Sequence, residues 1–108
     1  MITVRFSGIG ANLTGFSVRG HAGLAPHGQD ILCAAVSSAA YMTANTLAEI
    51  YGVPCDAQVG DGSMTVRLSA EDAEMVQPLL KGFSLHVREL SRQYPKQLKV
   101  IYGGKENA

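Results

Sequence analysis

Residues 20–37 read GHAGLAPHGQDILCAAVS and join a strand-like run to a strongly helical one. His21 follows directly after the alternating pattern of the strand, and Cys33 lies near the start of the helical run. The glycines and the proline between them are typical of a loop, and loops held by rigid elements commonly carry binding or catalytic groups. We therefore expect this connection to carry the chemistry, with the rest of the chain as its scaffold.

Cys33 is the candidate nucleophile. Asp30 is a good helix N-cap and would place Cys33 in the first turn of a helix predicted over residues 31–50. The unpaired amides and the positive dipole end of a first turn favour the reactive thiolate. With His21 as base and amides near the helix start as oxyanion donors, the segment holds the parts of a cysteine protease. His27, in the middle of the loop, is a competing base.

Each of these residues also has an ordinary structural interpretation. A lone cysteine in an alanine-rich helix is more often a small buried hydrophobe than a nucleophile. Asp30 is expected to cap the helix, with orientation of His21 as the alternative. Ser37 lies one turn after Cys33 on the same helix face, where it either lines the site or donates back to the carbonyl of Cys33. The sequence does not separate these two roles.

The other cysteine and histidine are assigned to the scaffold. Cys55 lies in an alternating run and is expected in the core, and His86 is expected on the surface of a second helix. Both thiols are expected to stay reduced, because a domain of this size in a reducing compartment does not need a disulfide. A metal site from His21, His27 and Cys33 fits none of the usual zinc spacings and lacks a fourth ligand. We expect no metal and no cofactor.

The rest of the chain alternates between strand and helix patterns, in the order ββαββαβ. This order indicates an α+β fold with helices packed on a mainly antiparallel sheet. Pro78 predicts a kink or a break in the second helix. We expect one domain over residues 1–108, with about 104–108 as a frayed tail. The predicted strands cover residues 2–7, 16–19, 51–59, 63–69 and 98–102, and the predicted helices cover about 31–50 and 70–94.

Composition places the chain among ordinary globular proteins, because 46% of its 108 residues are apolar and 17% are charged. The formal net charge is zero, with Lys and Arg in both halves, which gives no electrostatic reason to expect nucleic-acid binding. A zero net charge is still compatible with a local basic patch. The first residues lack the pattern of a signal peptide, and no apolar run approaches a membrane span. We expect a cytoplasmic protein outside the membrane.

Two motifs resemble a known family. Gly20-His21-Ala22, followed by Asp30-Ile31-Leu32-Cys33-Ala34-Ala35-Val36-Ser37, resembles the bacterial ribosomal-processing cysteine protease family, Prp. The resemblance covers nearly the whole chain. It implies a cytoplasmic, homodimeric endopeptidase that removes a short N-terminal extension from a large-subunit ribosomal protein during ribosome assembly. It also implies that Cys33 is the nucleophile and His21 the base, with Gly20, Asp30 and Ser37 supporting the site.

The resemblance further implies a substrate cut after two aromatic residues, and hence an apolar groove beside Cys33. No residue in the sequence specifically predicts that groove. Pro26, His27 and Pro78 depart from the family pattern. The resemblance therefore does not predict how the loop moves or how the second helix is shaped.

Two other functions fit the same residues. A non-catalytic peptide-binding module of ribosome assembly would hold a peptide without cutting it, and its Cys33 would react no faster than an ordinary thiol. A redox sensor would instead show reversible oxidation of Cys33 with loss of partner binding.

Overall fold

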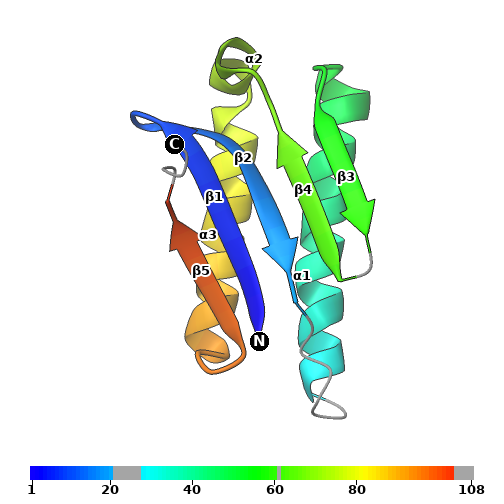
Figure 1. Ribbon diagram of the computed structural model, residues 1–108, viewed down its shortest axis with the longest axis vertical. Helices are drawn as coiled ribbons and strands as arrows, with labels where there is room; N and C mark the ends of the chain where they lie inside the picture. Colours follow the sequence, from blue (N-terminus) through cyan, green and yellow to red (C-terminus); the bar gives the residue numbers. More distant parts are fainter. Residues whose placement is uncertain (21–27, 61, 104–108) are drawn as a thin grey trace.

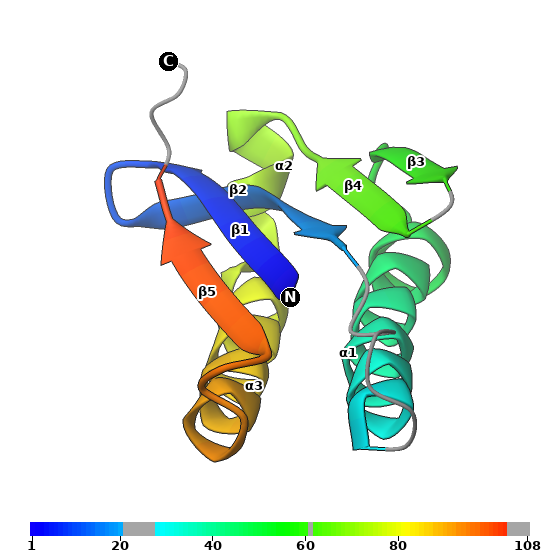
Figure 2. The ribbon, with the colours of Figure 1, turned by 60° about the horizontal axis from the view of Figure 1, so that its bottom comes forward.

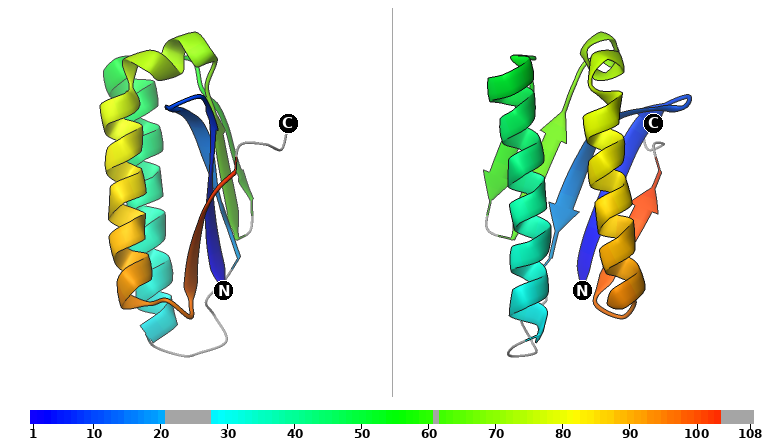
Figure 3. Two further views of the ribbon diagram at one scale, coloured as in Figure 1. Left: turned by 90° about the vertical axis from the view of Figure 1, so that its left-hand side faces the viewer. Right: turned by 180° about the vertical axis from the view of Figure 1, so that it is seen from behind.

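The period-two pattern at the start of the chain folds as a hairpin, and helices cover one face of the sheet that it begins (Figure 1, Figure 3). The computed structural model describes residues 1–20, 28–60 and 62–103, with the backbone alone at 28–30. In chain order the elements are β1 (Ile2–Ile9), β2 (Asn12–Arg19), α1 (Gly28–Asn45), the π-helical turn η1 (Thr46–Tyr51), β3 (Asp56–Gly60), β4 (Ser63–Arg67), α2 (Ala70–Met75), α3 (Gln77–Gln93) and β5 (Leu98–Tyr102).

The five strands form one sheet in the order β3-β4-β2-β1-β5. Three neighbouring pairs are antiparallel, and β5 runs parallel to β1. A parallel neighbour requires a crossover connection, and α3 provides the last part of it before β5. The prediction of an α+β fold with a mainly antiparallel sheet is confirmed.

The core lies between the sheet and the two long helices. Phe6 and Phe16 are opposite each other on β1 and β2, and the ring of Phe83 from α3 packs on both, with centroid distances of 5.6 Å and 4.7 Å. Burying a side chain of this size stabilises the fold by about 1.5–3 kcal/mol. Other fully buried members come from both helices and from the sheet, among them Val4, Leu32, Val36, Leu47, Val66, Leu80, Val87 and Leu98.

The start of α1 differs from the prediction. The helix begins at Gly28, so Asp30 is its third residue and not its N-cap, and Cys33 is its sixth residue and lies beyond the first turn. An acidic residue is favourable both at the N-cap and inside the first turn, because both positions face the positive end of the helix dipole. The residue type therefore does not fix the boundary. The predicted end is confirmed, since Gly52 caps η1 with a φ of 68°.

The second helical run is divided, as Pro78 predicts. Ser69 caps α2 by accepting a hydrogen bond from the amide of Asp72 at 3.1 Å, and α3 begins with Pro78 in its first turn, where proline is tolerated. The buried side chain of Gln77 anchors this junction to β2, because it accepts from the amide of Leu13 at 2.8 Å and donates to its carbonyl at 2.6 Å. The closure of α3 at Tyr94 and the last strand are also confirmed.

The strand predicted over residues 51–59 forms only from Asp56 onward. The preceding residues continue the helical path of η1 and then cap it at Gly52. β3 is an edge strand, and all five of its residues are exposed.

One helical span, Ile31–Tyr51, is long and apolar enough to cross a membrane by length and composition alone, contrary to the sequence expectation. The core helix of a globular domain passes the same test. Leu32, Val36 and Leu47 of this span are buried in the same core as the sheet residues. Part of the apolar surface of the helix is therefore buried inside the domain.

Candidate active site

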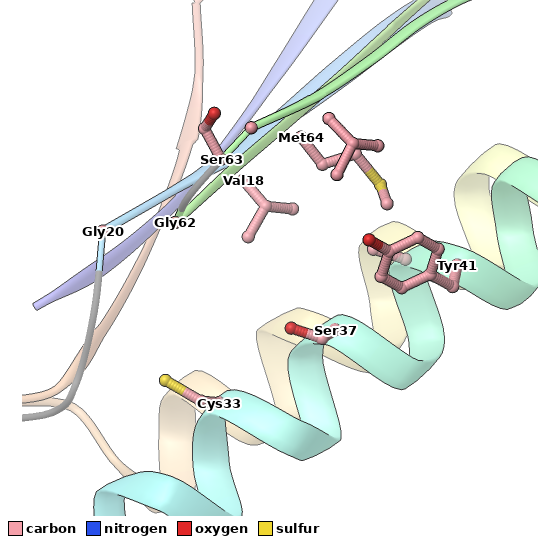
Figure 4. Close-up of a pocket in the computed structure, with 11 residues that line it drawn as sticks. Val18, Gly20, Cys33, Ser37, Tyr41, Gly62, Ser63 and Met64 are labelled. Carbon is pink, nitrogen blue, oxygen red and sulfur yellow. The ribbon is translucent and has the colours of Figure 1, made fainter.

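A groove of about 240 Å³ lies between α1 and the sheet, beside the end of β2 and the β3–β4 turn (Figure 4). Its floor is helical and its opposite wall comes from three strands. The side chains along it are mostly apolar or small, and Cys33 is the thiol among them. The lining residues are Cys33, Ser37, Ala40 and Tyr41 from α1, Val18 and Gly20 from the β2 end, and Val59, Gly60, Gly62, Ser63 and Met64 from the hairpin.

Three side chains of α1 follow one another along the groove. Cys33, Ser37 and Tyr41 are four residues apart, and residues at this spacing share one face of a helix. Figure 4 shows all three on the side of α1 that faces the sheet. The Cys33 side chain is half-buried and packs against the core, whereas Ser37 and Tyr41 are exposed. The thiol is therefore held by packing while remaining at the surface of the groove.

Hydroxyls of the α1–η1 span are placed in two ways. The hydroxyls of Thr43 and Thr46 donate back to the carbonyls four residues earlier, at 2.8 Å and 2.7 Å. The hydroxyl of Ser37 lies on the groove (Figure 4). Ser37 therefore lies where it could support the site, and its role stays a prediction.

Gly20 fixes the point at which the chain leaves β2. Its φ is 95°, a conformation that favours glycine, and a Cβ here would collide with the carbonyl oxygen of Met1. Its amide donates to the carbonyl of Gly62 at 2.9 Å, which ties the β2 end to the start of β4. The residue before His21 therefore has a structural reason to be glycine.

The structure brings Gly20, Cys33 and Ser37 to one groove. His21 and His27 lie outside the described residues, and Asp30 is placed by its backbone alone, so their side-chain roles stay predictions. Within the ranges that the structure describes, no group of three His, Cys, Asp or Glu side chains could hold a metal ion.

Cys55 and His86 lie elsewhere, in scaffold positions. Cys55 is half-buried against the core, and burial, followed by the adjacent carboxylate of Asp56, raises the pKa of its thiol above the ordinary value of 9.0. Cys33 and Cys55, both described, are not joined by a disulfide. His86 is exposed on α3, as predicted, and lines a separate apolar groove between the two long helices.

The apolar wall of the groove was not found from the sequence. Tyr41 had a local signal, because it continues the four-residue spacing of Cys33 and Ser37. Val18, Val59 and Met64 had none, because their meeting depends on strand order and on the register that pairs Val18 and Val59 with Met64.

A comparison with known protein families matches residues 1–99 to the family described as Cysteine protease Prp. The chain belongs to the Prp family of cysteine proteases. Prp enzymes are hydrolases that act on peptide bonds, so the predicted family and enzyme class are confirmed.

Three relatives show how far the similarity extends. The ribosomal processing cysteine protease Prp of Bacillus subtilis is 29% identical over 91 residues, which are 79% of this chain and 81% of that protein. A crystal structure of the essential ribosomal processing protease Prp from S. aureus with a substrate peptide has a TM-score of 0.85 at 21% identity, covering 95% of this chain and 100% of that one. The crystal structure of SMU.848 from Streptococcus mutans has a TM-score of 0.77 at 29% identity, covering 95% and 96%. The Prp fold thus extends over nearly the whole chain.

Proposed function

We propose that this Prp chain is an endopeptidase that removes a short N-terminal extension from a large-subunit ribosomal protein, with Cys33 as nucleophile and His21 as base. One observation carries the assignment of the site: Cys33 lines a groove that also holds Gly20, the residue from which the chain continues to His21. The names of the B. subtilis and S. aureus relatives, both ribosomal processing proteases, support the substrate class.

The proposed reaction uses Cys33 and His21 in turn. The sulfur of Cys33 attacks the carbonyl carbon of the scissile bond, and His21 gives the thiol proton to the leaving nitrogen. The mature ribosomal protein leaves as the amine, and the extension stays on Cys33 as a thioester. Water, deprotonated by His21, then hydrolyses the thioester and restores the thiol. The unpaired amides of α1 belong to its first turn, so the helical donors for the oxyanion come from residues before Cys33.

The walls of the groove suit the apolar end of such an extension. Val18, Val59 and Met64 offer apolar surface on the sheet side, and Tyr41 offers an aromatic ring on the helix side. Apolar side chains of the substrate gain free energy when they leave water for such a surface. This supports a cut after two aromatic residues, whose side chains would lie along the groove from Cys33 toward Tyr41.

Three residues support the site in different ways. Gly20 sets the exit of the chain toward His21, through its positive φ and its hydrogen bond to Gly62. Ser37 places a hydroxyl on the groove next to Cys33. Asp30 lies in the first turn of α1, where a carboxylate is favourable and from which it would orient His21. We further propose that the enzyme acts in the cytoplasm, on ribosomal protein precursors, as a homodimer.

The test compares the two cysteines. Purified native protein, Cys33→Ala and Cys55→Ala are incubated with a ribosomal protein precursor that carries its extension, and the products are measured by mass spectrometry. Loss of the nucleophile should reduce cleavage by at least ~10³-fold, whereas Cys55→Ala should cut at nearly the native rate. Cleavage retained by Cys33→Ala would reject the assignment. Tight binding of an intact precursor by the native protein would favour the peptide-binding module.

The rate of alkylation gives a second, independent measurement of the reactivity of the same two thiols. Iodoacetamide at neutral pH should modify Cys33 faster than Cys55, because the thiolate is the reacting form and burial raises the pKa of Cys55. Equal rates in peptide mapping would contradict an activated Cys33. Reversible oxidation of Cys33 that abolishes partner binding without any cleavage would favour the redox sensor.

A further inference from the structure

The neutral net charge conceals a separation of charge. Residues 1–20 and 77–103 hold seven of the nine Lys and Arg residues and a single acid, Glu89, whereas residues 28–76 hold seven of the nine acids and a single base, Arg67. The first set builds β1, β2, α3 and β5, and the second builds α1, η1, β3, β4 and α2. β5 and α3 of the first set lie at one edge of the molecule and β3 and α1 of the second set at the other, whereas α2, with its three acids, lies at the end of α3 and against β2 (Figure 1, Figure 2).

The positive charge gathers around edge strand β5. Lys81 and Arg88 lie on one face of α3 and line a shallow cavity together with Tyr102 of β5. On the uncovered side of the sheet, Lys99 pairs in register with Thr3, and Arg5 pairs with Ile101. All the basic side chains of this region are exposed. We call the following five residues the basic edge: Arg5, Lys81, Arg88, Lys96 and Lys99.

The cations of the basic edge are not neutralised inside the described part of the chain. The ion pair found there joins Arg92 to Glu89, at 3.1 Å. None of the five basic-edge residues has a carboxylate within the described ranges at ion-pair distance. A surface with an excess of one sign of charge attracts an oppositely charged partner. The basic edge therefore fits a polyanion.

Tyr102 gives the basic edge an aromatic surface. Its ring stacks on Phe6 with a centroid distance of 5.4 Å, and its hydroxyl is hydrogen-bonded to Ser84. The residue is nevertheless 49% exposed. Tyr102 shares its cavity with Lys81 and Arg88. A held aromatic ring beside basic side chains is the combination that binds single-stranded nucleic acids, because bases stack on the ring while cations hold the phosphates. The planar guanidinium groups of Arg5 and Arg88 also match phosphate geometry.

We propose that the basic edge around Tyr102 binds single-stranded RNA, through the phosphates and one stacked base. This surface lies away from the groove of Cys33, so it goes beyond the proposed peptidase function. It would let the enzyme associate with the RNA of an assembling particle while the groove receives the protein substrate. The ring of Tyr102 favours RNA over an acidic protein segment, which has no bases to stack.

The experiment measures binding of a fluorescein-labelled, mixed-sequence single-stranded RNA of about 12 nucleotides, within the usual site sizes, by fluorescence anisotropy. If about four phosphates are neutralised, affinity should fall about 50-fold between ~50 and ~200 mM salt. The triple variant Lys81→Gln, Arg88→Gln, Lys99→Gln should abolish most of this binding and of its salt dependence. Native-like binding by the triple variant would overturn the proposal.

Two matched pairs sharpen the test. Arg5→Gln and Arg67→Gln each remove one positive charge from an exposed arginine of the sheet, on β1 and β4 respectively. Only Arg5 belongs to the basic edge. Arg5→Gln should weaken binding several-fold and Arg67→Gln should leave it unchanged, and equal losses would contradict the assignment. Tyr102→Leu should cost about tenfold through lost stacking, whereas Tyr102→Phe, which keeps the ring, should bind nearly as the native protein does.

Two further outcomes would also overturn the proposal. Competition by poly-glutamate at the same charge concentration as RNA would identify an acidic protein segment as the partner. Salt-sensitive association beyond the proposed homodimer, measured by sedimentation and not reversed by RNA, would identify acidic residues of a further copy as the partner. Peptide cleavage by the triple variant should be unchanged, and RNA binding by Cys33→Ala should be native, so that a failure of this proposal and a failure of the peptidase assignment can be told apart.

Discussion

Helices α1 and α3 cover the same face of the sheet, but they expose different chemistry. From residue 31 to residue 48 α1 and η1 carry no charged side chain, and Ile31, Tyr41 and Met42 are exposed there. α3 buries Leu80, Phe83 and Val87 and exposes mainly polar and charged residues. An amphipathic helix such as α3 buries its apolar face in the core and exposes polar and charged side chains to water on its outer face. The outer surface of α1 keeps exposed apolar side chains.

The first prediction separates the two helices by their histidines. His21→Ala, at the residue that follows Gly20 in the chain, should lower the rate of precursor cleavage by about 10²–10⁴-fold, the usual contribution of a general base. His86→Ala, on α3, should leave the rate within about twofold of native, because the side chain is exposed and lines another groove. Initial rates measured by mass spectrometry decide between them. Equal effects of the two substitutions would contradict the choice of base.

The second prediction compares a buried side chain of α3 with an exposed one of α1. Phe83→Ala should lower the free energy of unfolding by about 3–5 kcal/mol, since it leaves a cavity beneath Phe6 and Phe16. Met42→Ala should change it by less than about 0.5 kcal/mol, because the Met42 side chain is 59% exposed. Urea unfolding followed by circular dichroism measures both. A large loss in Met42→Ala would show that the outer face of α1 is covered in solution.

The third prediction compares the stability effects of two glycine substitutions, one at Gly20 after β2 and one at Gly82 within α3. Gly20→Ala should destabilise the protein by about 1–3 kcal/mol, the usual cost of a strained backbone conformation, and it should also slow cleavage by moving the exit toward His21. Gly82→Ala, in α3 with open space around its Cα, should stabilise the protein by about 0.5–1 kcal/mol through helix propensity. Melting temperatures of the two variants should therefore move in opposite directions. A native melting temperature for Gly20→Ala would reject the steric argument.

The smallest effect is expected at Cys55, on the α1 side of the sheet. The folded pKa of this thiol is raised above 9.0, so the folded state keeps the proton at a pH where the unfolded chain has lost it. Its contribution to stability is complete below pH 9.0 and is lost as pH rises through the folded pKa. The melting temperature of the native protein should thus fall more steeply above pH 9.0 than that of Cys55→Ala. Parallel curves for the two proteins would contradict the pKa direction.

Local chemistry was enough to predict the elements that depend on neighbouring residues. The period-two runs of β1 and β2, the break at Pro78 and the end of the first helical run near residue 50 each follow from backbone preferences over a few residues. The start of α1 could not be predicted in this way, because an acidic residue such as Asp30 is favourable both at the N-cap and inside the first turn of a helix. The late start of β3 was missed because η1 extends the helical path toward Gly52.

The sequence by itself determined the family, the α+β class and the presence of a thiol on the first long helix, because motifs and periodicity are local properties of the chain. Only the tertiary structure decided which residues surround that thiol. Val18, Val59 and Met64 reach the groove through strand order and register, which no short stretch of sequence contains. The separation of charge has the same origin. Basic residues from the two ends of the chain meet at one edge of the sheet, because β5 pairs with β1 there, while β3 with the acidic Asp56 lies at the other edge.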